Sequence, residues 1–232
     1  MEKHLSSQFD AELNALCAQV LHMGGMVELQ LTNALHCLSH NDMRLADKVI
    51  ATELQVNQLE IDIDRDCGST IARRQPTARD LRLLMAVSKC TTNLERAGDE
   101  AVRVARLAKQ IHASGLPRGM KFSDLRLEAE LAGQLLHKAL DAFARLDTVA
   151  AEQILRDDKF IDSEFEGFVR KLITYVMEDP RTITAALDLL FVAKAIERIG
   201  DHAKNIAEFV IYIVKGTDIR HAPLPDAEKP AP

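Results

Sequence analysis

The sequence predicts an all-α protein made of two tandem, similar three-helix bundles. Helix-forming residues dominate the 232-residue chain, which has no Trp, only 4% aromatic residues, 10 glycines and 7 prolines. This composition favours helices over strands. The segment LERAGD at 94–99 recurs, 102 residues later, as IERIGD at 196–201. A repeat of this kind indicates a duplicated structural unit.

The first repeat, residues 1–114, is predicted to contain helices over 9–38, 42–73 and 77–111. A polar turn at 39–42 separates the first two, and Asp42 is placed to cap the second helix through its side-chain oxygen. Pro76 separates the second and third, because proline cannot continue the preceding helix. Such short connections make neighbouring helices antiparallel.

The second repeat, residues 120–215, is predicted to follow the same plan with helices over 123–146, 147–178 and 181–215. Asp147 occupies the capping position that Asp42 has in the first repeat, and Pro180 marks the second break. The linker 114–119 is rich in glycine and proline. The segment 216–232 is proline-rich with little apolar content, and we expect a disordered tail there.

The charge balance argues against a nucleic-acid binder and the apolar pattern against a membrane protein. The net charge is −6, whereas duplex-DNA binding favours a basic face. There is no apolar run of about 20 residues and no apolar signal-peptide core near the N-terminus. We therefore expect a cytoplasmic protein without direct membrane insertion. The cysteines have no Cys-x-x-Cys spacing and are expected to be reduced core residues: Cys17, Cys37, Cys67 and Cys90.

Each predicted third helix carries the pattern Glu-x-x-x-Asp. Residues four apart lie on the same helix face, so the two carboxylates repel each other. A glycine precedes each aspartate, which costs about 1 kcal/mol in a helix but leaves a bare surface for close approach. The carboxylate pairs are Glu95 with Asp99, and Glu197 with Asp201.

Counting residues along each antiparallel hairpin places further oxygen ligands beside these pairs. Position 97 falls level with position 54, and position 199 falls level with position 161. The second helices therefore add Glu53 and Asn57 in the first repeat, and Asp158 and Asp162 in the second. Clusters of three or four oxygen ligands suit hard cations, so we expect magnesium, manganese, iron or calcium.

Three alternatives remain open from the residues alone. The acids could form a solvated stripe balanced by nearby basic residues, which are Arg96, Arg103, Arg198 and Lys204. The chain could be a structural helical scaffold without metal. It could also be a carboxylate-bridged metalloenzyme, but the Glu-x-x-His motif of di-iron bundles is absent. We expect no catalytic activity.

Four motifs, one of them the repeat described above, carry a family resemblance. They are MGGMVE at 23–28, RQPTARDLR at 74–82, the twofold Glu-Arg-x-Gly-Asp at 95–99 and 197–201, and Tyr-x-x-Lys-Gly at 212–216. With these motifs the chain resembles the PhoU family of phosphate-transport regulators from about residue 9 to residue 221. A single Glu-Arg-x-Gly-Asp would be unspecific, whereas two copies together with the proline segment are specific.

The resemblance implies a fold of two similar three-helix bundles, a homodimer, and a non-catalytic regulator. The family motif implies metal ligands at Glu95, Asp99, Glu197 and Asp201, with Asp158 and Asp162 added. Asn57 stands in place of an acid in the first repeat. The implied partners are the phosphate ABC transporter ATPase and a membrane sensor histidine kinase, which would hold the protein at the inner face of the membrane. The implied role is repression of the phosphate-starvation response.

Overall fold

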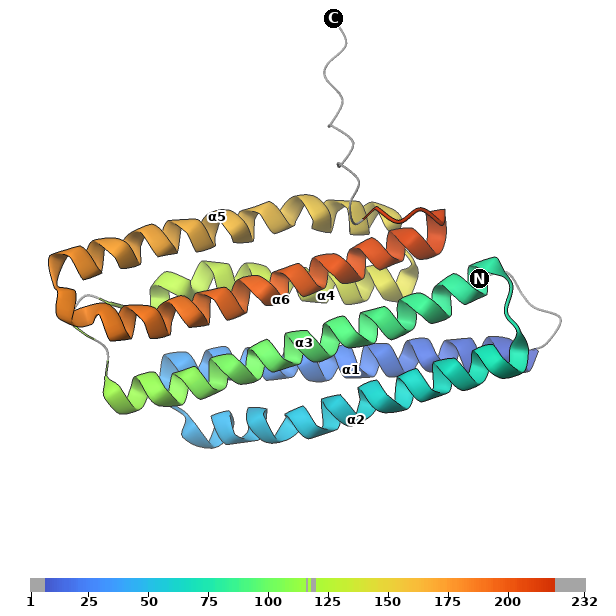
Figure 1. Ribbon diagram of the computed structural model, residues 1–232, viewed down its shortest axis with the longest axis horizontal. Coiled ribbons are helices and arrows are strands. Elements are labelled where there is room, and N and C mark those ends of the chain that lie inside the picture. The colour runs from blue at the N-terminus through green and yellow to red at the C-terminus, as the bar shows by residue number, and fades with distance from the viewer. Residues whose placement is uncertain (1–6, 116, 118–119, 220–232) are drawn as a thin grey trace, which may run out of the picture.

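The structure, a computed structural model, describes residues 7–115, 117 and 120–219. In these residues six long helices and two short 3-10 helices account for the regular structure, and there is no strand (Figure 1). The all-α prediction is therefore confirmed. The elements are α1 (Ser7–His40), α2 (Met43–Arg74), α3 (Ala78–Ser114), η1 (Phe122–Leu125), α4 (Arg126–Arg145), α5 (Thr148–Glu178), η2 (Pro180–Thr182) and α6 (Ile183–Lys215).

The two predicted N-caps are confirmed. Asp42 Oδ1 accepts a hydrogen bond from the backbone N–H of Leu45 at 3.1 Å. Asp147 Oδ1 accepts from the N–H groups of Val149 and Ala150, each at 3.0 Å. These bonds satisfy backbone donors that have no partner within the first helical turn. The equivalent caps start α2 and α5 at matching positions in the two repeats.

The structure corrects several predicted helix boundaries: α1 extends two residues further at each end than predicted, and α3 ends at Ser114 rather than at residue 111. The helix expected from residue 123 begins at Arg126, because 122–125 form the 3-10 turn η1. The last helix begins at Ile183 rather than at residue 181. There Asp179 Oδ1 accepts from the N–H of Arg181, and the residues after it form η2. Of the tail expected to be disordered, 216–219 are irregular and 220–232 lie outside the described residues.

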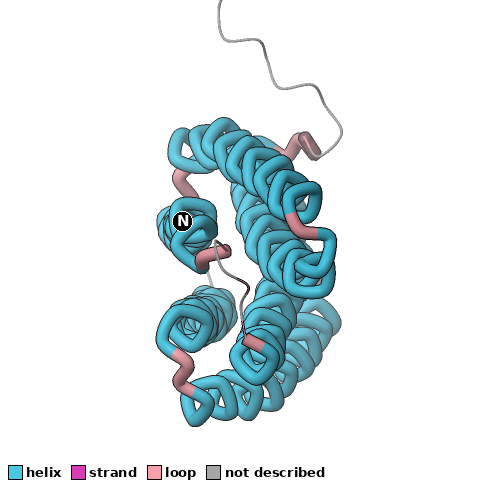
Figure 2. The backbone as a smooth tube through the Cα atoms, turned by 90° about the vertical axis from the view of Figure 1, so that its left-hand side faces the viewer, coloured by secondary structure: helices cyan, strands magenta, loops and turns pink. Residues whose placement is uncertain are grey.

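The two repeats pack against each other mainly through their third helices. The interface between α3 and α6 is the most extensive in the described structure. Helices α2 and α5 lie at the two outer edges, and α1 and α4 lie together on one side (Figures 1 and 2). The α2/α3 and α5/α6 connections lie at opposite ends of the molecule (Figure 1). This arrangement leaves the second and third helices of each repeat side by side, which is what the candidate sites require.

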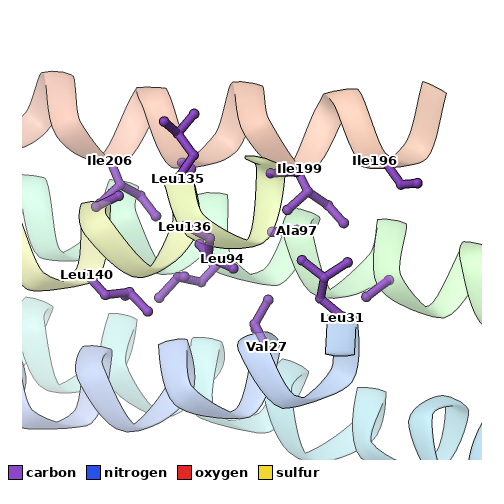
Figure 3. Packing of buried hydrophobic residues seen from close by; sticks show 14 of the residues in the cluster. Val27, Leu31, Leu94, Ala97, Leu135, Leu136, Leu140, Ile196, Ile199 and Ile206 are labelled. Carbon is purple, nitrogen blue, oxygen red and sulfur yellow. The ribbon is translucent and has the colours of Figure 1, made fainter. Parts of the chain in front are cut away.

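One continuous apolar core joins the repeats. Leu31 of α1, Leu94 of α3, Leu136 of α4 and Ile199 of α6 meet near its centre (Figure 3). All four side chains are almost completely buried. No described helix combines the length and apolar character needed to cross a bilayer. The three buried cysteines and the half-buried Cys17 are free, as predicted.

Candidate functional site

In the second repeat, the predicted carboxylates lie where α5 faces α6. Asp158 of α5 is 2% exposed, whereas Asp162, one turn further on, is exposed. Glu197 and Asp201 lie on α6 and are half-buried. The hairpin count is confirmed here, because Gly200 of α6 lies against α5 close to Asp158.

These carboxylates interact electrostatically around Asp201. Burial raises the pKa of Asp201 to about 6, and the charges of Glu197, Asp158 and Asp162 add to the shift. Burial disfavours the charged form of an acid, and neighbouring negative charges do the same. Lys204 opposes the shift, and its Nζ lies 2.6 Å from Asp158 Oδ2. Lys194 Nζ likewise lies 2.6 Å from Glu197 Oε2, so two lysines stand among the four carboxylates.

In the first repeat, the carboxylates occupy equivalent places on α2 and α3. Burial raises the pKa of Glu95, and Asp99 and Glu60 raise it further. The pKa of Asp99 is also raised, first by burial and then by Glu53. The predicted residues of each repeat therefore form one interacting acidic group rather than separate surface charges.

The register of the first hairpin agrees with the predicted one to within one turn, which is the error that such a count carries. Position 98 was expected level with position 53, but a Cβ on Gly98 would lie 3.6 Å from Val56. The difference is three residues, less than one turn. Two helices that cross at an angle do not meet residue for residue, so a count from the turn accumulates an error. Asn57, the residue after Val56, has its Oδ1 buried without a hydrogen-bond partner.

Each repeat places a basic side chain of its third helix on the second-helix carboxylate. Lys204 contacts Asp158, and Arg106 Nη2 lies 3.0 Å from Glu53 Oε2. Lys204 was among the basic residues weighed as balancing charges, whereas Arg106 was not. As the side chains stand, no three Asp, Glu, His or Cys residues within 7–115, 117 and 120–219 are arranged to hold a metal ion. The chemistry of the donor set fits a hard cation, provided that these basic groups move away.

Sequence reasoning missed three acidic residues near the clusters. Glu60 of α2 raises the pKa of both Glu95 and Asp99. Its spacing of seven from Glu53 places the two on one helix face and could have indicated this. Glu100 is buried and binds Arg198 of the other repeat at 2.8 Å.

The third missed residue is Glu128 of α4. Its side chain is buried and neither carboxylate oxygen has a hydrogen-bond partner. Burial raises its pKa to about 8, with Glu197 and Glu164 adding to the shift. In the sequence, Glu128 stands on an otherwise apolar face of its helix, and this pattern could have indicated a buried acid.

The two motif aspartates also share a polar cavity between α3 and α6. The cavity has a volume of about 690 Å³, and Asp99 and Asp201 both line it. His202 lies there as well, with Nδ1 3.1 Å from Asn93 Oδ1. Burial lowers the pKa of His202 to about 4, so it is neutral at pH 7. The repeats therefore bring their motifs to one junction.

The fold and this duplicated carboxylate hairpin define a class of tandem helical-bundle proteins, and comparison with known proteins gives the family. The PhoU domain model matches residues 20–108 and 125–210. A phosphate-specific transport system accessory protein PhoU homolog from a Burkholderia species is 54% identical over 222 residues, covering 95% of this chain and 94% of the relative. The corresponding protein of Escherichia coli is 48% identical over 229 residues, covering 95% and 91%. The chain belongs to the PhoU family.

Solved structures agree with this assignment. The crystal structure of PhoU from Pseudomonas aeruginosa matches with a TM-score of 0.86 and 45% identity, covering 90% of this chain and all of that one. The phosphate transport system regulatory protein PhoU from Streptococcus pneumoniae matches with a TM-score of 0.83 at 26% identity, covering 90% and 98%. The expected family and its helical architecture are confirmed.

Proposed function

We propose that this protein is a non-catalytic regulatory adaptor of phosphate uptake. In this role it links the ATPase of the phosphate ABC transporter to a membrane sensor histidine kinase and represses phosphate-starvation signalling. The protein would act as a homodimer in the cytoplasm, at the inner face of the membrane, through these partners. The observation that carries the proposal is identity of 48–54% over nearly the full chain to proteins named as accessory proteins of phosphate transport.

The adaptor proposal is tested by direct binding. The purified full-length protein is immobilised, and the transporter ATPase and the cytoplasmic part of the sensor kinase are applied separately. An ATPase from an unrelated ABC transporter is the control. We expect both phosphate-system partners, and not the control, to be retained. Retention of neither partner overturns the proposal.

We further propose that the two acidic groups bind divalent or iron-type metal ions. In the second repeat the ligands would be Asp158, Asp162, Glu197 and Asp201, and in the first Glu53, Glu95 and Asp99. The raised pKa values of Glu95, Asp99 and Asp201 support this, because a cation placed among the carboxylates would relieve their mutual repulsion. Carboxylate oxygens are the preferred ligands of magnesium and manganese.

Elemental analysis of protein purified without chelator tests the metal proposal. The variant Glu95→Ala with Glu197→Ala removes one motif carboxylate from each repeat. Its matched control is Asp47→Ala with Glu152→Ala, two equivalent acids that pair with lysines away from the motifs. We expect the first variant to lose magnesium, manganese or iron and the control to retain it. Equal metal content in all three proteins would contradict the metal proposal.

A further inference from the structure

A large groove lies between the C-terminal part of α1 and the N-terminal part of α4. It has a volume of about 1260 Å³ and is lined by α1 from Glu28 to His40, by the segment 120–125, and by α4 from Arg126 to Lys138. This exceeds the range of about 300–1,000 Å³ that is usual for small-molecule sites. The groove lies away from the acidic motifs, none of whose residues line it.

The groove is closed at one end and open at the other. At the closed end α1 and α4 touch: Gly24 packs against Leu140, and His137 Nδ1 lies 2.8 Å from Glu28 Oε1. Towards His40 of α1 and the start of α4, the 120–125 segment also lines the groove. The result is a channel bounded by two helices.

The floor of the groove is apolar. Leu31, Leu136 and Leu125 line it but are almost completely buried. The apolar surface that it offers comes from Leu35 and Phe122 near the mouth. Leu35 and Phe122 remain partly exposed. Phe122 is held in place by His112 of α3, whose ring lies 5.2 Å away and whose Nε2 reaches the carbonyl oxygen of Leu38 at 2.9 Å. The apolar surface is therefore fixed by the fold and available to another molecule.

The mouth of the groove carries positive charge, in contrast to the chain as a whole. Lys121 and Arg126 are exposed there, against one acid, Glu130. The only ion pair among these three joins Arg126 Nε and Glu130 Oε1 at 3.9 Å, with both side chains more than half exposed. Such a pair contributes little. The mouth thus has a net positive charge on a chain whose net charge is −6.

We propose that this groove, lined by 28–40 and 120–138, is a docking site for an amphipathic α-helix of a partner protein. The helix lays an apolar face on Leu35 and Phe122, whose side chains are partly exposed in the groove, and directs acidic side chains to Lys121 and Arg126. Charge complementarity at the mouth selects an acidic occupant. The part of α1 that lines the groove spans twelve helical steps of about 1.5 Å each, so it is about 18 Å long. This length suits about three turns of a bound helix with apolar residues at i, i+3, i+4 and i+7.

The test uses two fluorescently labelled helical peptides of about 14 residues with the same leucine face, spaced i, i+3, i+4 and i+7. One carries glutamate and the other lysine at the flanking positions. Binding to the full-length protein is followed by fluorescence anisotropy. We expect the acidic peptide to bind at least about tenfold more tightly, a difference of about 1.4 kcal/mol. Non-specific attraction to a chain of charge −6 would favour the basic peptide instead.

A charge reversal at the mouth locates the binding. Lys121→Glu with Arg126→Glu is expected to reverse the preference of the two peptides. The control is Arg156→Glu with Lys159→Glu on α5, which changes the net charge equally at exposed positions outside the groove. We expect this control to keep the preference for the acidic peptide. All four substituted residues are exposed, so the fold tolerates both variants.

A steric block provides the second measurement. Gly133 lies in the groove wall, and the nearest atom to a Cβ there is Leu31 Cδ2 at 3.9 Å. A side chain at this position fits the helix and fills the closed end of the groove. Gly133→Phe should abolish binding of the acidic peptide while leaving the helical circular dichroism unchanged.

Binding of neither peptide, or binding that ignores both the charge reversal and Gly133→Phe, overturns the proposal. This assay contains no transporter ATPase, kinase or metal. If the peptide assay fails, the docking proposal is rejected and the adaptor proposal is unaffected. If the partner-binding experiment fails, the adaptor proposal is rejected and the docking proposal is unaffected.

Discussion

The buried carboxyl of Glu128 makes a quantitative prediction about pH and stability. The residue is 2% exposed and both its oxygens lack partners. The perturbation is Glu128→Gln, which keeps the shape of the side chain and removes its proton equilibrium. Burial and the charges of Glu197 and Glu164 raise its pKa from 4.5 to about 8 in the folded state. The unfolded chain has no such environment.

The sign of the effect follows from proton binding. Between pH 4.5 and pH 8 the folded state holds a proton on Glu128 that the unfolded state has lost, so unfolding is favoured as the pH rises. Each unit of pKa difference is worth about 1.4 kcal/mol. pH 7 lies about 2.5 units above the pKa of the unfolded state, and the folded state still holds its proton there. The free energy of unfolding at pH 7 is therefore about 3 kcal/mol lower than at acid pH on account of Glu128. The stability that the neutral acid provides is complete below pH 4.5 and is lost as the pH rises through 8.

The assay is urea unfolding, followed by circular dichroism, at several pH values between 5 and 8. Other groups titrate in this range, so the informative quantity is the difference between the wild type and the variant. We expect the free energy of unfolding of Glu128→Gln, relative to wild type, to rise by about 3 kcal/mol across this range. Glu130→Gln, which changes an exposed glutamate two residues along, is the control and should parallel the wild type. Parallel curves for Glu128→Gln would refute the reasoning.

Two further predictions concern stability in urea. Lys204→Gln leaves the buried Asp158 unpaired and should cost about 2 kcal/mol, whereas Arg106→Gln, which breaks the more exposed pair with Glu53, should cost less than about 1 kcal/mol. Equal losses in these two variants would contradict the role given to burial. Asp147→Ala removes the cap of α5 and should cost about 1 kcal/mol, and an unchanged unfolding midpoint would show the cap to be redundant.

Features that depend on local sequence were predictable. The caps at Asp42 and Asp147 and the breaks before Pro76 and Pro180 are set within a few residues, and the structure confirms them. The hairpin count agreed with the structure in the second repeat and to within one turn, a difference of three residues, in the first. The approach of Gly98 to its neighbours depends on the crossing of two helices, which no turn sequence specifies.

Features that depend on contact between the repeats were not predictable. The groove lies between α1 and α4, which meet at Gly24 and Leu140, and these two helices belong to different repeats. Glu128 is buried within its own repeat, near Glu197 of α6 and Glu164 of α5, and its own helix likewise does not determine this packing. The pairing of Arg198 with Glu100 also joins the repeats and has no signal in either segment alone.

Packing explains one part of the duplicated motif and leaves the other unexplained. A Cβ on Gly200 would lie 2.7 Å from Ile161 Cδ1, so the close approach of α5 and α6 is reason enough for a glycine there. Close packing of the helices does not explain the carboxylates of the motif. Burial and neighbouring carboxylates raise the pKa values of Glu95 and Asp99, which marks an unfavourable environment for charge at both positions. A helix that needed only to pack would gain stability from neutral residues at both positions. A positively charged ligand, as proposed above, would relieve this cost at the acids, whereas packing alone accounts for the glycine at position 200.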